Sequence, residues 1–132
     1  VGYLKSSRRD VEAWSLLADC RRKKNDWTGA VKAYREIIEL GESAATNRAR
    51  LKAASVLQGK LDDHEAAVPL LRAYIARGAP IRSLQAAARL RLARSLEALG
   101  KSDAAIKQMQ TVADDYADTS AGREASELLS HE

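Results

Sequence analysis

The chain has 132 residues, of which 45% are hydrophobic and 30% charged, and this suits one globular domain with a core of its own. It has no Phe and only two Pro, and it is rich in Ala, Leu, Arg and Glu, which favour helices over strands. The formal net charge of +4 permits nucleic acid or an acidic protein as a partner but requires neither. These features predict an all-α protein.

The first two helices are predicted from apolar stripes and a turn. Ser7 and Asp10 have the spacing of a capping box and predict the start of the first helix. Trp14 and Leu17 belong to its apolar stripe, and the basic run 21–24 suits its C-terminal end. A turn at 25–26 leads to a second amphipathic stretch that is expected to end at Gly41.

Four more helices and a last short one are predicted further along the chain. Weaker stripes indicate a helix pair between residues 44 and 78, with Pro69 inside its second member, where it should remove one hydrogen bond and bend the helix. Another pair is expected between 83 and 117. Thr119 or Ser120 then caps a helix over 120–131.

An internal repeat relates these pairs. The segments 26–31, 63–68 and 101–106 align without gaps, and Ala30, Ala67 and Ala105 occupy the same place in each. A nearly constant period of this length predicts stacked copies of one two-helix unit.

The repeat resembles the tetratricopeptide family, whose pattern is W-x₂-L-G-x₂-Y followed by A-x₃-F. The matching residues are Trp14, Leu17, Ala18, Ala30 and Tyr34 in the first unit, Leu51, Ala54, Ala67 and Leu71 in the second, and Arg89, Leu92, Ala93, Ala105 and Met109 in the third. The final proline of the pattern is absent, and the units are longer than usual, as in longer-period bacterial members. Frequent Arg and Ala also favour a bacterial source.

The resemblance implies a right-handed superhelix of about three antiparallel helix hairpins, a TPR-like α-α solenoid, with a C-terminal capping helix. We expect one domain over 1–132, with units at about 8–41, 44–78 and 83–117 and the capping helix at 120–131. Small residues such as Ala18 and Ala30 would let paired helices approach closely.

The resemblance further implies a protein–protein interaction module that binds a peptide or a partner helix in a concave groove lined by the first helix of each unit. By position, this partner groove would contain Glu12, Ser15, Asp19, Arg22, Lys23, Ala49, Lys52, Val56, Lys60, Ala87, Leu90, Arg94 and Glu97.

One subclass of the family clamps a C-terminal carboxylate with two Lys, two Asn and one Arg. The matching residues are Ser15, Asp19, Ala53, Ala87 and Arg91, of which only Arg91 conforms, while Asp19 would repel a carboxylate. We therefore predict no clamp of this kind.

Catalytic, metal-binding and cofactor-binding motifs are not found in the sequence. His64 and His131 have no Cys or carboxylate at metal-ligand spacing and are predicted to be surface residues. Cys20 is the only cysteine and is predicted to be a small core residue. Trp14 and Trp27 match core positions of the repeat. No enzyme activity and no cofactor are expected.

Two alternatives to a peptide-binding groove remain open. Basic helix faces with residues 21–24, Arg48, Arg50, Arg89 and Arg91 would suit nucleic acid or an acidic partner. Self-association into a homo-oligomer is the other, with Tyr3 and Leu4 covering a neighbour. No apolar run is long enough for a membrane span. The chain begins at Val1, as a fragment would, so the compartment stays open.

Overall fold

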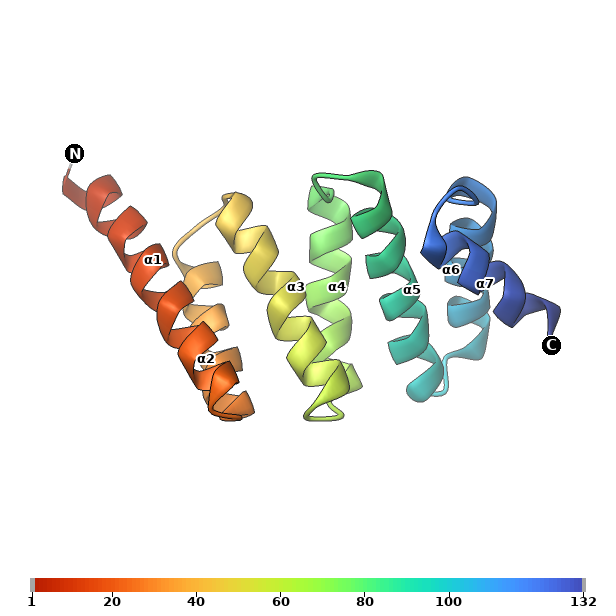
Figure 1. Ribbon diagram of the computed structural model, residues 1–132, viewed down its shortest axis with the longest axis horizontal. Helices are drawn as coiled ribbons and strands as arrows, with labels where there is room; N and C mark the ends of the chain where they lie inside the picture. The colour runs from red at the N-terminus through yellow and green to blue at the C-terminus, as the bar shows by residue number, and fades with distance from the viewer. Residues whose placement is uncertain (1, 132) are drawn as a thin grey trace. The chain divides into compact units, whose positions relative to one another are not determined.

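The computed structural model describes the backbone of residues 2–131 and the side chains of residues 8–131. This part of the chain contains helices and no strand, which confirms the predicted all-α class (Figure 1). The helices are α1 (Gly2–Lys23), α2 (Trp27–Glu39), α3 (Ala44–Gly59), α4 (His64–Arg77), α5 (Arg82–Ala98), α6 (Ser102–Asp115) and α7 (Ser120–Ser130). They form two compact units: the first, Val1–Asp63, contains α1 to α3, and the second, His64–Glu132, contains α4 to α7.

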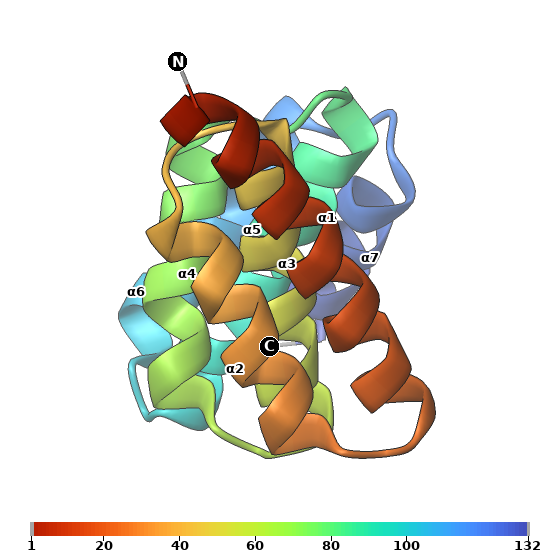
Figure 2. The ribbon, with the colours of Figure 1, turned by 90° about the vertical axis from the view of Figure 1, so that its left-hand side faces the viewer.

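The hairpin of α1 and α2 is held by its turn and by small residues at the helix crossing. Asn25 adopts a left-handed conformation with φ 63°, and the Asp26 carboxylate accepts a hydrogen bond from the Gly29 amide at 3.0 Å, which caps α2. Ala18 and Ala30 are both completely buried. Figure 2 shows the two helices antiparallel, as predicted for a close hairpin.

Helix α3 packs on α2 to complete the first unit. Gly41 has φ 119°, so the chain leaves α2 in a conformation that favours glycine, as the sequence predicts. Ser43 caps α3 by accepting from the Thr46 amide at 3.2 Å, and the Thr46 hydroxyl donates to the Gly41 carbonyl. These local bonds fix where α3 starts against α2.

The second unit is built around α5, which contacts α4, α6 and α7. Its large apolar residues Leu92 and Leu96 are fully buried, as are Leu71 on α4 and Val112 on α6. Helix α4 continues through the predicted breaker Pro69 to Arg77. The bend expected at this proline stays a prediction.

A group of contacts that we call the Arg82 clasp fixes the turn between α6 and α7 to the start of α5. The Arg82 guanidinium donates to both Asp118 carboxylate oxygens at 3.0 to 3.2 Å and to the Asp115 carbonyl, and it lies 4.7 Å from the centre of the Tyr116 ring. Thr119 caps α7 by accepting from the Gly122 amide at 3.0 Å, which confirms the predicted cap. A side chain at position 122 would collide with the Tyr116 carbonyl, so glycine is required there.

Three sequence predictions differ from the structure. Helix α1 begins at Gly2, several residues before the capping-box spacing at Ser7, because a capping signal also fits inside a longer helix. Cys20 is exposed and not in the core, although Ala18, two residues earlier, is completely buried. His64 is half-buried, with Nδ1 3.0 Å from the Ser95 hydroxyl, so it is not a plain surface residue.

The predicted contacts of Tyr3 and Leu4 with a neighbouring copy lie outside the described side chains.

Candidate functional site

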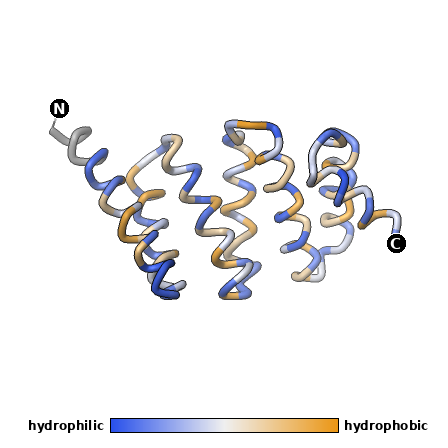
Figure 3. The backbone as a smooth tube through the Cα atoms, in the orientation of Figure 1, coloured by the Kyte–Doolittle hydropathy of each residue, from blue (hydrophilic) through white to orange (hydrophobic). Residues whose placement is uncertain are grey.

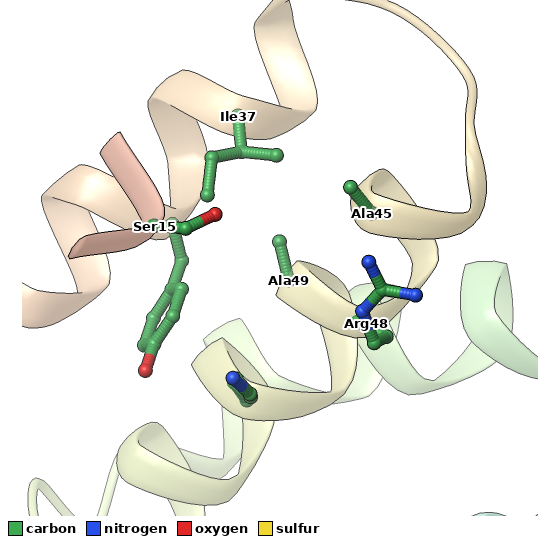
Figure 4. A pocket seen from close by; sticks show the side chains of 7 residues that line it. Ser15, Ile37, Ala45, Arg48 and Ala49 are labelled. Carbon is green, nitrogen blue, oxygen red and sulfur yellow. The ribbon is translucent and has the colours of Figure 1, made fainter. Parts of the chain in front are cut away.

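A small hollow opens on the first unit where residues of all three helices meet. We call it the α1–α3 hollow. Its polar lining is Ser15, Tyr34, Arg48 and Lys52, and its apolar lining is Ile37, Ala45 and Ala49. The cavity volume is about 30 Å³. Figure 4 shows Ser15 and Ile37 on one side of the hollow and Ala45, Ala49 and Arg48 on the other.

The shape of the hollow follows from small residues at facing positions. Ala49 is buried and Ala45 half-buried on α3, and both present only a methyl group toward Ile37 of α2. Larger side chains at these two positions would fill the space. The hollow is therefore a direct result of the alanine-rich sequence of α3.

A chain of polar contacts lies along one edge of the hollow. The buried Tyr34 hydroxyl donates to Asp19 at 3.2 Å, and the Asp19 carboxylate lies 3.8 Å from the Lys52 ammonium and 4.0 Å from the Arg22 guanidinium. Burial raises the pKa of the Tyr34 phenol; the Arg22 charge lowers this pKa, and Asp19 raises it. The phenol therefore stays protonated and orients Asp19 at neutral pH.

Arg48 is the cation of the hollow that has no internal partner. Its side chain is exposed, and no acidic residue among the described side chains pairs with it. Lys52, one helical turn later on α3, shares Asp19 with Arg22. The hollow thus has an excess of positive charge on its α3 side.

The predicted groove residues of the first unit separate into two groups. Ser15 and Lys52 line the hollow together with Ala49, and Asp19 and Arg22 join them through the ion pairs. Lys60 instead lies over the Trp27 ring of α2, 5.1 Å from its centre. Val56 is only 5% exposed and has little surface to offer. Glu12 and Lys23 are exposed on α1.

The predicted groove residues of the second unit all lie on α5. Leu90 is 5% exposed, and Ala87 is half-buried. Arg94 is exposed and forms an ion pair with Glu124 of α7, while Glu97 is exposed near the end of the helix.

Several arginines of the predicted basic faces are engaged inside their own unit. Arg21 donates to the Gly29 carbonyl at 3.0 Å, Arg50 pairs with Glu42, and half-buried Arg89 bonds to Gln108 at 3.3 Å. Of the others, residues 22–24 lie at the strongly hydrophilic end of α1 and its turn (Figure 3), whereas Arg48 lies on α3 and Arg91 on α5.

No aromatic side chain between residues 8 and 131 is exposed. Tyr34 and Tyr74 are buried, and Trp14, Trp27 and Tyr116 are half-buried. Stacking platforms for bases need accessible rings, so the surface described for each unit lacks a main element of single-strand recognition.

The groove predicted from the sequence did not include the residues of α2 and α3 that complete the hollow, namely Tyr34, Ile37, Ala45 and Arg48, although Arg48 was named for the basic-face alternative. The prediction took the groove only from matching positions on the first helices of the units. The four-residue spacing of Arg48 and Lys52 on one face of α3 is the signal that would have found the cationic side.

Within the described residues, no group of three or more His, Cys, Asp and Glu side chains is placed to hold a metal ion. No helix of this part of the chain has the length and apolar character needed to cross a membrane.

Two family models match the chain, both described as tetratricopeptide repeat, one over residues 2–45 and the other over residues 87–119. The first covers the α1–α2 hairpin and the start of α3, and the second covers most of α5 and all of α6. The chain therefore belongs to the tetratricopeptide repeat family, as its repeat pattern predicts. No curated protein matches it. Repeats of this family generally mediate protein–protein interactions and are typically non-catalytic.

Proposed function

We propose that this chain is a scaffold or adaptor domain that binds a segment of a partner protein, without catalysis, on the α1–α3 surface of its first unit. The observation that carries the proposal is the α1–α3 hollow, which combines a concave surface with an exposed and internally unpaired cation, Arg48. Concave sites with a few fixed polar groups among apolar ones are the usual places where proteins hold ligands.

The edge of the hollow is organised before any partner arrives. The Tyr34 hydroxyl is buried and holds Asp19, and Asp19 in turn lies beside Lys52 and Arg22. Groups that are already oriented lose less conformational entropy when a partner binds. This favours a binding role for the surface over that of a solvated helix face.

Charge reversal of Arg48 tests the proposal. We would immobilise the chain and capture binders from a lysate of the source cells, comparing wild type with Arg48→Glu. Arg35→Glu is the matched control, because Arg35 is an exposed arginine of the same unit on α2. Lys52→Glu is less suitable, because it would place a second carboxylate beside Asp19.

The proposal predicts a protein that both wild type and Arg35→Glu retain and that Arg48→Glu loses. Equal retention by all three forms would contradict it. Recovery of nucleic acid at low salt and its release at high salt would instead support the basic-face alternative, since phosphate contacts are strongly salt-dependent.

A further inference from the structure

The charges around the α1–α3 hollow do not balance. Asp19 is the single acidic side chain of the cluster, and Arg22, Arg48 and Lys52 surround it or line the hollow. Arg22 and Lys52 both lie within 4.0 Å of Asp19, so this one carboxylate is shared by two cations and offsets only one positive charge. Arg48 then remains as a cation that no internal carboxylate neutralises. An anionic group from outside would reduce the positive charge of the cluster and give Arg48 a partner.

The size of the hollow limits what that anion can be. A cavity volume of about 30 Å³ holds roughly two water-sized groups. A carboxylate presents two oxygens of this size, whereas the head group of a phosphate carries four. The steric limit therefore favours a carboxylate.

The walls of the hollow distinguish a side-chain carboxylate from the end of a chain. Ile37, Ala45 and Ala49 are apolar and suit the methylene carbons that carry a Glu or Asp carboxylate. A C-terminal carboxylate is attached to a carbon that also bears a peptide N–H, and burying that group without an acceptor is unfavourable. Ser15 contributes a hydroxyl to the wall that lies opposite Arg48 (Figure 4).

We infer that the α1–α3 hollow receives the side-chain carboxylate of a Glu or Asp within an internal segment of the partner protein. The Arg48 guanidinium donates to the carboxylate, which is a strong charge-assisted bond, and the Ser15 hydroxyl donates a second hydrogen bond. The inference rests on the proposed function and specifies the chemistry of its partner. It differs from a C-terminal clamp, because the cation that binds the carboxylate, Arg48, does not stand at a clamp position, although Ser15 does.

Blocked tripeptides test this chemistry without knowledge of the partner. The probes are Ala-Glu-Ala and Ala-Gln-Ala, each N-acetylated and C-amidated, and N-acetylated Ala-Ala-Ala with a free C-terminal carboxylate. Each is titrated into ¹⁵N-labelled chain, and amide and arginine Nε–H shifts are followed by NMR. We expect saturable shifts at Ser15, Arg48 and Ala49 with the Glu peptide. The Gln peptide and the peptide with a free C-terminal carboxylate should bind at least about tenfold more weakly.

Two variants of the hollow and one control variant outside it assign the binding to the hollow. Arg48→Gln should weaken Glu-peptide binding about tenfold, and the matched control Arg35→Gln should leave it unchanged. Ser15→Ala should give a smaller loss. Equal binding of the Glu and Gln peptides, shifts that map away from the hollow, or preference for the free C terminus would each overturn the inference.

The two proposals fail in different ways. If Arg48→Glu loses a captured protein but the Glu and Gln peptides bind alike, the acidic-segment inference is wrong and the proposed interaction surface stands. If Glu selectivity is seen but the capture shows no dependence on Arg48, the hollow binds carboxylates and the proposed function is wrong.

Discussion

The two units of this chain use the same repeat with opposite charges at equivalent positions. Asp19 follows Ala18 on α1 and lies beside Lys52 of α3, whereas Arg94 follows Ala93 on α5 and pairs with Glu124 of α7. The alanines are completely buried in both units. The repeat therefore restricts the size of the packed residue and leaves the sign of the neighbouring charge free to vary.

A second contrast lies in how each unit fills its hairpin. Trp14 of the first unit corresponds to Arg89 of the second, and both are half-buried. Arg89 bonds to Gln108 through one terminal nitrogen, but its Nε is buried without a hydrogen-bond partner. A polar side chain thus occupies a packing position in the second unit at a cost in desolvation that the first unit avoids.

The largest effect is expected from filling the helix crossing of the first unit. Ala30→Trp places a large ring where the side chain is 0% exposed, and overpacking of this kind costs about 1–3 kcal/mol or more. The control Lys32→Trp adds the same ring at an exposed position of α2 and should change stability by less than about 0.5 kcal/mol. Urea unfolding followed by circular dichroism measures both. Equal stability of the two variants would mean that the register of the hairpin is wrong.

Substitutions at the equivalent positions of the two hairpins, Trp14 and Arg89, are expected to change the free energy of unfolding in opposite directions. Trp14→Ala removes half-buried apolar area and should destabilise the chain by about 2 kcal/mol, less than for a fully buried ring. Arg89→Met keeps much of the side-chain volume and removes the unsatisfied Nε, so it should stabilise the chain by about 1 kcal/mol. Both are measured by the same urea titration. A destabilised Arg89→Met would show that the guanidinium contributes more than it costs.

The Arg82 clasp should make the second unit acid-sensitive. The hydrogen bond from Arg82 lowers the pKa of Asp118 below its ordinary value of 3.8. A carboxyl with a lowered pKa contributes stability above its ordinary pKa, and this contribution is lost as the pH falls through the lowered value. Asp118→Asn should therefore be less stable than wild type at pH 7, and thermal melting should show the difference disappearing in acid. A difference that persists in acid would contradict the clasp.

The smallest effects are expected from the exposed ion pairs themselves. Arg94→Glu should cost about 0.2–1 kcal/mol because it faces Glu124, and adding Glu124→Arg should restore most of the loss. The matched cycle in the first unit uses Asp19→Lys and Lys52→Asp. A double-mutant cycle for each pair would show whether the two ion pairs, whose charges are reversed relative to each other, have the same coupling energy. Absence of coupling in both would make the charge pattern irrelevant to stability.

The sequence predicted the features that depend on local chemistry and on side-chain size. Gly41 and Thr119 were recognised because a left-handed residue and a hydroxyl cap have strong residue preferences. Ala18 and Ala30 were recognised because a close helix crossing needs small residues.

Features set by tertiary packing were less predictable. Cys20 was placed in the core on its neighbours alone, because periodicity does not fix which edge of an apolar stripe is covered. The α1–α3 hollow depends on three helices and on two alanines of α3, so no single helix pattern predicts it. The predicted partner groove as a whole, like the three-unit division of the chain, stays a prediction.

The most direct test of partner binding at the α1–α3 surface is photo-crosslinking from this surface in the source cells. A benzophenone amino acid at Glu12, exposed on α1 one turn before Ser15, is compared with the same group at Lys32, exposed on α2. We expect a crosslinked protein from position 12 that Arg48→Glu abolishes and that position 32 does not give. Equal crosslinking from both positions, or a product that Arg48→Glu leaves unchanged, would contradict the assignment of this surface.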